Sequence, residues 1–322
     1  MSIGRTFCAA ALAAVMFAPL ASGAQQWPKK PVRIIVPFGA GGGTDIQARL
    51  LGKNFQQSMK QTFIVDNRAG ASGIIGAELA VRSAPDGYTI LFTTASLAVN
   101  VTLYGKRVKF DPLNDLAPVS WISSTPLVLV IHPSVPVKSV QELVALAKRT
   151  GKMNAASNGA GTTSHLSIEM LKQMTGVNVA HIPYKGGGPS MAALMGGETE
   201  FLFATGPVAA TQVKAGKIRA LAVTTVKKSS TFPDLPTMNS IYAGFESDNW
   251  YAMFFPARTP QPIVDKLNAE IRKALQADDI RAFMVREALD PVASSPDELR
   301  ANFKREIARY AKIIKAGNIT VQ

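Results

Sequence analysis

Four glycine-rich turns constrain the fold of this 322-residue chain most strongly. Each follows a short apolar run and opens an amphipathic segment, and they occupy residues 39–43, 70–76, 159–161 and 186–188. Glycine lets the backbone turn tightly and approach a ligand closely, and the first amides of a helix lack intrahelical partners. Ligands of open α/β sheets bind beyond the carboxyl ends of the strands. Two such turns in each half of the chain therefore predict two facing α/β units around a cleft lined by amides and hydroxyls.

The first unit alternates strands and helices, as expected of a parallel sheet covered by helices. Strands are expected at residues 32–38, 62–67 and 88–94, with helices at 44–59 and 74–83. Two apolar runs follow at 119–122 and 127–131, separated by Pro126, and a capping box at Ser139 begins a helix that extends to residue 149. This region is interpreted as the crossing into the second unit.

The second unit repeats the alternation. Strands are expected at 153–157, 179–184, 200–204 and 218–224, with one helix at 165–174 and another ending at 195. The apolar run at 250–256 predicts a buried strand that returns to the first unit. Three helices follow, at 262–277, at 280–287 and after a capping box at Ser295. The predicted lobes are 25–122 with 250–322, and 123–249.

The N-terminal segment is typical of a signal peptide. Arg5 precedes an Ala-rich apolar run at residues 7–21 and small residues at 22–24, so cleavage after residue 24 and export are expected. Cys8, the single cysteine of the sequence, lies in that segment, which leaves no thiol for a disulfide or metal site in the mature chain. The formal charge of +13 comes from scattered Lys and Arg, which argues against nucleic acid.

Residue patterns for catalysis, metals and nucleotides are weak. The chain has no Gly-x-Ser-x-Gly motif, no recurring metal-ligand spacing and three histidines. A dinucleotide fingerprint fails because Thr44 stands at its third glycine, and a P-loop fails because no Lys follows the glycines. We therefore expect no catalytic residue, no cofactor and no metal. Asp45 either caps its helix or contacts the ligand, and His165 either donates to the ligand or anchors its loop.

Several separated motifs resemble the periplasmic substrate-binding receptors of tripartite tricarboxylate transporters, called Bug-type receptors. They include residues 36–45, 67–76, 157–166 and 183–186, and further matches extend to Lys266-Leu267-Asn268, so the resemblance covers essentially the whole mature chain. It implies an α/β, two-lobed fold like that of type II periplasmic binding proteins, in which each lobe is a sheet flanked by helices. It also implies hinge closure on a small carboxylate and delivery to membrane permease subunits.

The resemblance points to ligand-binding residues in two facing loops, with two weaker candidates from position alone. In the family the carboxylate is held by amides, hydroxyls and waters. The candidates are Phe38, Ala40, Gly41, Gly42 and Asp45 in the first loop, Ser157, Gly161, Thr162, Thr163 and His165 in the second, and Ser96 and Thr205 after other strands. Phe38 and Tyr184 are also expected to form walls of the cleft.

The sequence thus favours a monomeric, periplasmic, non-enzymatic solute receptor. Two alternatives stay open at this point. One is an exported hydrolase or decarboxylase that acts on a small carboxylate, which would need a nucleophile, base or metal. The other is a ligand-binding partner of a membrane sensor, which would use the same binding chemistry.

Overall fold

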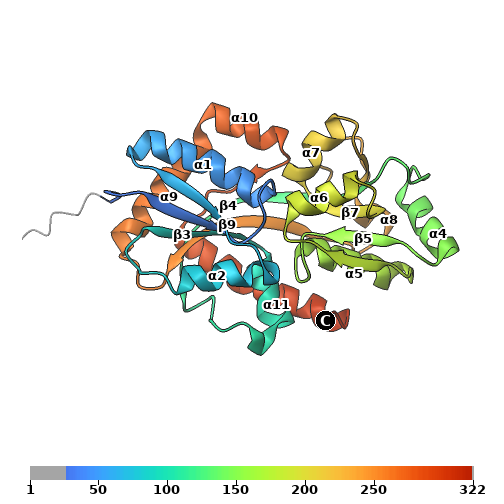
Figure 1. Ribbon diagram of the computed structural model, residues 1–322, viewed down its shortest axis with the longest axis horizontal. Helices are drawn as coiled ribbons and strands as arrows, with labels where there is room; N and C mark the ends of the chain where they lie inside the picture. The colour runs from blue at the N-terminus through green and yellow to red at the C-terminus, as the bar shows by residue number, and fades with distance from the viewer. Residues whose placement is uncertain (1–26, 321–322) are drawn as a thin grey trace, which may run out of the picture.

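The computed structural model describes residues 27–320, and the signal peptide predicted at 1–24 lies outside them. Figure 1 shows strands and helices gathered into two groups, joined by strands that run from one group into the other. Ten strands form a sheet in the order β2-β1-β3-β9-β4-β7-β5-β6, and β8 and β10 pair with β4 off this path. The strands are β1 Val32–Val36, β2 Phe63–Asn67, β3 Thr89–Thr94, β4 Leu116–Ile131, β5 Asn154–Ser157, β6 Ala180–Pro183, β7 Phe201–Thr205, β8 Arg219–Val223, β9 Asp248–Pro256 and β10 Asp290–Pro291.

The long strand β4 belongs to both lobes. Its first part pairs antiparallel with β9 as far as Pro126, and its second part pairs antiparallel with β7 from Leu127 onward. The two apolar runs separated by Pro126 are therefore one continuous strand, which passes from the sheet of the first lobe into that of the second. Proline has no amide hydrogen to donate, and it is tolerated here because the partner strand changes at this position. The exact lobe boundaries stay a prediction.

Helices cover both faces of the sheet in each lobe. They are α1 Gly43–Met59, α2 Ile74–Val81, α3 Ser96–Leu103, α4 Val140–Thr150, α5 Thr163–Thr175, α6 Gly187–Met195, α7 Gly206–Lys214, α8 Met238–Ile241, α9 Gln261–Gln276, α10 Asp278–Arg286 and α11 Pro296–Ala316, with 3-10 turns η1 Ala71–Gly73 and η2 Gly105–Arg107. The capping box predicted at Ser295 is confirmed, since its hydroxyl accepts from the Glu298 amide. Helices α3, α7 and α8 were not foreseen from the sequence.

The inner strands β1 and β3 of the first lobe are buried on both faces, which explains their continuous apolar runs. Ile34 and Ile35 are both fully buried on opposite faces of β1. Ile34 belongs to a core cluster that includes Phe55 of α1, whereas Ile35 belongs to one that includes Ala77 of α2 and Phe303 of α11. Figure 1 accordingly shows α1, α9 and α10 on one side of this sheet and α2 and α11 on the other. Strands β1, β2 and β3 run parallel, and the turn that follows the carboxyl end of β1 contacts the second lobe.

Candidate functional site

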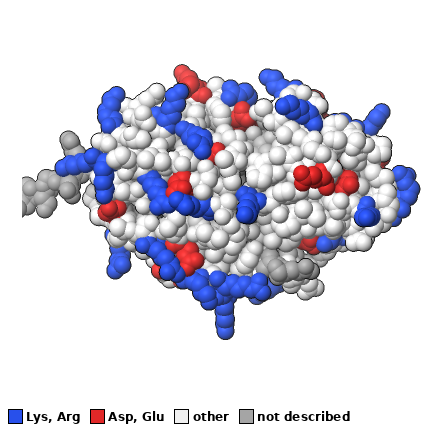
Figure 2. Space-filling model, in the orientation of Figure 1, with Lys and Arg blue, Asp and Glu red and all other residues white. Residues whose placement is uncertain are grey.

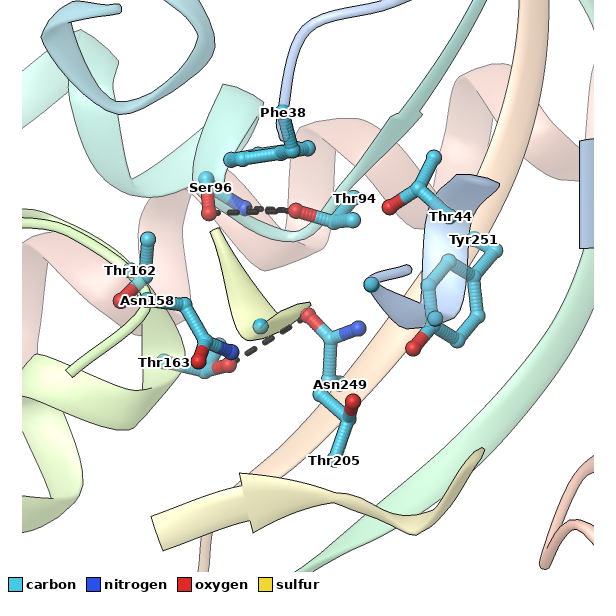
Figure 3. A pocket seen from close by; sticks show the side chains of 13 residues that line it. Phe38, Thr44, Thr94, Ser96, Asn158, Thr162, Thr163, Thr205, Asn249 and Tyr251 are labelled. Atoms are coloured by element: carbon cyan, nitrogen blue, oxygen red, sulfur yellow. Dashed lines mark hydrogen bonds between the residues drawn. The ribbon is translucent and has the colours of Figure 1, made fainter. Parts of the chain in front are cut away.

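A cavity of about 30 Å³ lies between the lobes, where strands end and helices begin. Figure 3 shows Phe38 on one side of it and Asn249, Tyr251 and Thr205 on another. The lining residues are Phe38, Gly42, Gly43, Thr44, Thr94, Ser96, Asn158, Thr162, Thr163, Gly187, Thr205, Asn249 and Tyr251. None of these described residues carries a formal charge. The cavity is therefore polar through amides, hydroxyls and side-chain amides.

Five helices begin at this cavity. Gly43, Ser96, Thr163 and Gly187 are the first residues of α1, α3, α5 and α6, and Thr205 is the N-cap of α7. All five line the cavity. Each helix N-terminus presents amides without intrahelical partners and carries roughly half a positive charge. Their convergence makes the cavity suited to an anion although no cationic side chain lines it.

The glycines of two turns let the lobes meet closely. A Cβ on Gly188 would lie 2.2 Å from the Ala40 carbonyl oxygen, and one on Gly39 would lie 2.9 Å from the Lys185 carbonyl oxygen. The Gly39 amide donates to that same Lys185 oxygen at 2.7 Å. The turn at 39–43 from the first lobe therefore packs directly on the turn at 186–188 from the second, and side chains would keep them apart.

Three buried polar atoms of the cavity lack a hydrogen-bond partner among the described residues. They are Thr205 Oγ1, Asn249 Nδ2 and the Tyr251 hydroxyl. Burial raises the pKa of Tyr251 to about 12, so its phenol is neutral and keeps its proton at neutral pH. The Thr163 hydroxyl donates to Asn249 Oδ1 at 3.3 Å, which leaves the Asn249 amide hydrogens for another acceptor (Figure 3). The side chains of Thr205 and Asn249 lie beside the Tyr251 hydroxyl and partly offset the rise in its pKa, so the three polar atoms form one buried group that could meet an acceptor.

Six of the candidate residues line this cavity together. They are Phe38, Gly42, Ser96, Thr162, Thr163 and Thr205. Ser96 accepts a hydrogen bond from the Thr94 hydroxyl at 3.1 Å, and Thr162 caps α5 by accepting from the His165 amide. Their role in ligand binding stays a prediction, but the prediction of two facing ligand-binding loops requires that they lie together in this way.

Two candidates of the first loop, Ala40 and Gly41, do not line the cavity, and neither does Asp45. Ala40 packs on Gly188, while Asp45 Oδ2 accepts from the Gly41 amide at 3.0 Å and from Arg49 Nε at 3.0 Å. Although burial raises the pKa of Asp45, hydrogen bonds from Arg49 and Gly41 lower it below its usual value. The Asp45 side chain thus points back along the turn and accepts from a backbone amide, which favours the structural role over contact with the ligand.

In the second loop, Ser157, Gly161 and His165 do not line the cavity either. The Ser157 hydroxyl lies 2.5 Å from His181 Nε2, and the Gly161 amide donates to His165 Nδ1 at 3.1 Å. The Ser157 and His165 side chains are thus engaged in contacts within and behind the loop instead of lining the cavity. Of the two roles considered for His165, the geometry supports the anchor.

Seven lining residues were absent from the candidate set. They are Gly43, Thr44, Thr94, Asn158, Gly187, Asn249 and Tyr251. Most of them adjoin a recognised turn. Asn249 and Tyr251 lie on β9, far from any motif, although a buried Asn beside an apolar run is a signal that could have pointed to them.

A second cavity of about 180 Å³ adjoins the first and shares Phe38 and Asn158 with it. Tyr184, expected as a cleft wall, lines this neighbour. Here the lobes are joined by hydrogen bonds, because Ser72 and Tyr104 of the first lobe both donate to the Ala160 carbonyl of the second, Tyr104 at 2.8 Å. Ala71 and Ser72 have φ of 43° and 54°, a strained conformation for non-glycine residues.

Removing both donors, as Ser72→Ala with Tyr104→Phe, should accelerate ligand dissociation by about tenfold, since two cross-lobe hydrogen bonds of the closed form are lost. Stopped-flow displacement measures the dissociation rate. Tyr88→Phe is the control, because its hydroxyl accepts from the Lys29 amide at the far end of the first lobe. An unchanged rate in the double variant would exclude a role for this contact in closure.

Comparison with known proteins matches residues 47–319 to the family model described as tripartite tricarboxylate transporter family receptor. Protein BugT of Bordetella pertussis is 36% identical over 296 residues, covering 91% of this chain and 90% of that protein. An R. palustris protein solved with adipate is 33% identical with a TM-score of 0.88, covering 91% of this chain and 99% of the other. MatC from Rhodopseudomonas palustris, solved with bound malate, is 28% identical with a TM-score of 0.83, covering 89% and 100%.

Proposed function

The chain belongs to the family of tripartite tricarboxylate transporter receptors, and from this premise we propose that it binds a small carboxylate in the cavity between its lobes. The observation that carries the proposal is the convergence of five helix N-termini and three unpartnered polar atoms on one uncharged cavity. A carboxylate accepts several hydrogen bonds and carries the charge that these termini favour. Two of the structural relatives were solved with a carboxylate, adipate in one and malate in the other.

Closure of the lobes explains how uncharged donors could bind an anion tightly. Hydrogen bonds to a charged acceptor are stronger than neutral ones, and exclusion of water strengthens them further. The cavity is small, about 30 Å³, so separation of the lobes would give a ligand room to enter. The hinge at β4 and β9 would allow this motion.

The comparisons support a receptor over the two alternatives. The matching family is described as receptors of a transporter, which argues against an exported hydrolase or decarboxylase and against a sensor partner. Within residues 27–320, no group of three or more His, Cys, Asp or Glu side chains is placed to hold a metal.

Membership of this family also supports a proposal about the protein's location and partners. We propose export through the segment 1–24, action in the periplasm as a monomer, and delivery of the ligand to permease subunits. None of the helices within residues 27–320 has the length and apolar character of a membrane span. Lys and Arg are dispersed over the face in Figure 2 among Asp and Glu, in keeping with a protein that has no nucleic-acid partner.

Thermal unfolding with a series of acids tests the proposal. Malate, adipate and related acids should include one that raises the melting temperature, because a ligand specific for the native state stabilises it. The matching amides keep the shape but lack the charge, and they should raise it by much less. Equal shifts with acid and amide, or turnover of an ester or oxo-acid without any shift, would overturn the proposal.

A further inference from the structure

The loop between β5 and α5 delivers Asn158, Thr162 and Thr163 to the cavity. Its two glycines, Gly159 and Gly161, have φ of 133° and 90°, so the backbone itself offers many other conformations. Something else must therefore select the conformation that lines the cavity. The side chains behind the loop are the candidates, since they contact its backbone directly.

Two histidines lie behind this loop as a stacked pair. The rings of His165 and His181 are 4.1 Å apart with an 18° angle between their planes, and His165 is only 4% exposed. His165 Nδ1 accepts from the Gly161 amide at 3.1 Å. Ser157 Oγ already accepts from the Gly159 amide at 3.1 Å, so its proton can be donated to His181 Nε2 at 2.5 Å. His165 thus accepts a hydrogen bond that orders the loop, and His181 contacts the serine that accepts from the Gly159 amide.

We propose that the stacked His165–His181 pair is the positioning element that holds the β5–α5 loop in its ligand-binding conformation, and that His165 does so only as a neutral imidazole. An amide N–H can donate but cannot accept, so a proton on His165 Nδ1 would face the Gly161 N–H donor to donor. Ser157, by contrast, has a hydroxyl that can turn. The loop conformation therefore depends on an unprotonated Nδ1 of His165, and His181 holds the His165 ring in place by stacking on it.

The tautomer that this geometry requires for His165 also argues against a metal on that ring. With Nδ1 accepting, neutral His165 carries its proton on Nε2, which leaves that nitrogen no lone pair for a metal. Because the Ser157 hydroxyl can either donate or accept, the geometry fixes the tautomer of His165 and not that of His181.

Solvent can reach the pair from the side opposite the ligand. A cavity of about 410 Å³ there is lined by both rings together with Glu169, Lys172 and the C-terminal residues 318–320. Glu169 Oε1 lies 3.8 Å from His165 Nε2 and 2.9 Å from Lys172 Nζ. Burial, with a smaller contribution from Lys172, lowers the pKa of His165 to about 4. Burial and the neighbouring His165 lower that of His181 to about 3, against the opposing effect of Glu169.

The sign of the pH effect follows directly. A pKa of about 4 in the folded protein, below the ordinary 6.5, means that the folded form resists protonation. Native stability is therefore retained above pH 6.5 and falls as the pH decreases toward 4. In the folded protein His165 takes up its proton only near pH 4, and there its protonation should release the loop and weaken ligand binding.

Two variants of His165 separate the acceptor from the ring. His165→Phe keeps an aromatic ring stacked on His181 but has no hydrogen-bond acceptor. It should weaken binding of the acid that raises the melting temperature by about tenfold or more. His165→Asn can place Oδ1 near the former Nδ1, and it should retain affinity within about threefold. Calorimetry as the pH is lowered from 7 through 4 should show an added loss of affinity in the wild type, setting in near pH 4, that His165→Asn lacks. The ligand's own titration is common to both proteins and cancels in the comparison.

The proposal rests on the proposed function, but two measurements without ligand test it independently. Nitrogen-15 NMR should show His165 as the Nε2–H tautomer, and hydrogen exchange of amides 158–163 should accelerate in His165→Phe but not in His165→Asn. The Nδ1–H tautomer on His165, or unchanged affinity and exchange in His165→Phe, would overturn the proposal. A wild-type protein with the expected tautomer and exchange that binds none of the acids would instead overturn the proposed function.

Discussion

Gly43→Ala should abolish carboxylate binding while the protein stays folded. A Cβ at this position would lie 2.2 Å from the Tyr251 hydroxyl and 3.2 Å from Thr205 Oγ1, two of the unpartnered atoms of the cavity. The added methyl group occupies the space in which these atoms meet the ligand. We expect the dissociation constant, measured by calorimetry, to rise by about a hundredfold or more, equivalent to about 2.7 kcal/mol.

Gly52→Ala is the matched control in the same helix. A Cβ there would make only ordinary contacts, the nearest at 3.5 Å from Phe63 Cβ. Alanine is favoured over glycine inside a helix by about 0.5–1 kcal/mol, so this variant should be slightly more stable and bind normally. If Gly43→Ala binds as well as Gly52→Ala, the cavity is not the ligand site.

Tyr251→Phe should move stability and binding in opposite directions. The Tyr251 hydroxyl is fully buried beside Thr205 and Asn249 but makes no hydrogen bond of good geometry, so its removal should leave the stability of the free protein nearly unchanged or slightly higher. The same change removes a donor to the charged ligand, a loss of about 1.5–3 kcal/mol, or roughly 10- to 150-fold in affinity. Thermal melts without ligand and calorimetry with ligand measure the two effects.

Tyr310→Phe provides the opposite case. Its hydroxyl is also buried but accepts a hydrogen bond from Arg309 Nη2 at 3.0 Å, on α11 away from the cavity. This variant should lower stability by about 1 kcal/mol and leave affinity unchanged. A Tyr251→Phe protein that is destabilised yet binds normally would show that the hydroxyl serves the fold and not the ligand.

The double variant Gly43→Ala with Tyr251→Phe separates steric from hydrogen-bonding effects. Removal of the hydroxyl relieves the closest contact of the new methyl group, so the melting temperature should return toward that of the wild type. Binding should stay weak, because both the space and the donor are gone. Recovery of binding would mean that Gly43→Ala acts only by displacing the Tyr251 ring.

Much of the local structure was predictable from neighbouring residues. The helix after Ser295 begins where its capping box predicts, and the strand expected at 32–38 is found at Val32–Val36. These features depend on interactions within a few residues, namely capping hydrogen bonds and apolar periodicity. Three of the glycine turns likewise located the strand ends from which α1, α5 and α6 reach the cavity, whereas α3 and α7 follow none of them.

The direction of individual side chains was less predictable. Asp45 and His165 lie in the correct loops but point behind them, into hydrogen bonds with Gly41 and Gly161. A loop residue has two sides available, and the choice depends on packing against elements distant in sequence. The motif therefore identified the loop but not which of its side chains line the cavity.

The sequence by itself determined the alternation of strands and helices, the glycine-rich turns that begin α1 and α6, and membership of a receptor family. The tertiary structure alone decided that Asn249 and Tyr251 of β9 line the cavity. The β4–β9 pairing, with register shifts at Pro118/Ser120 and Trp121/Ser123, sets which β9 side chains face each side. Because side chains alternate along a strand, a shift of one residue would turn Tyr251 away from the ligand. Such a register depends on contacts across the whole molecule, which no local pattern encodes.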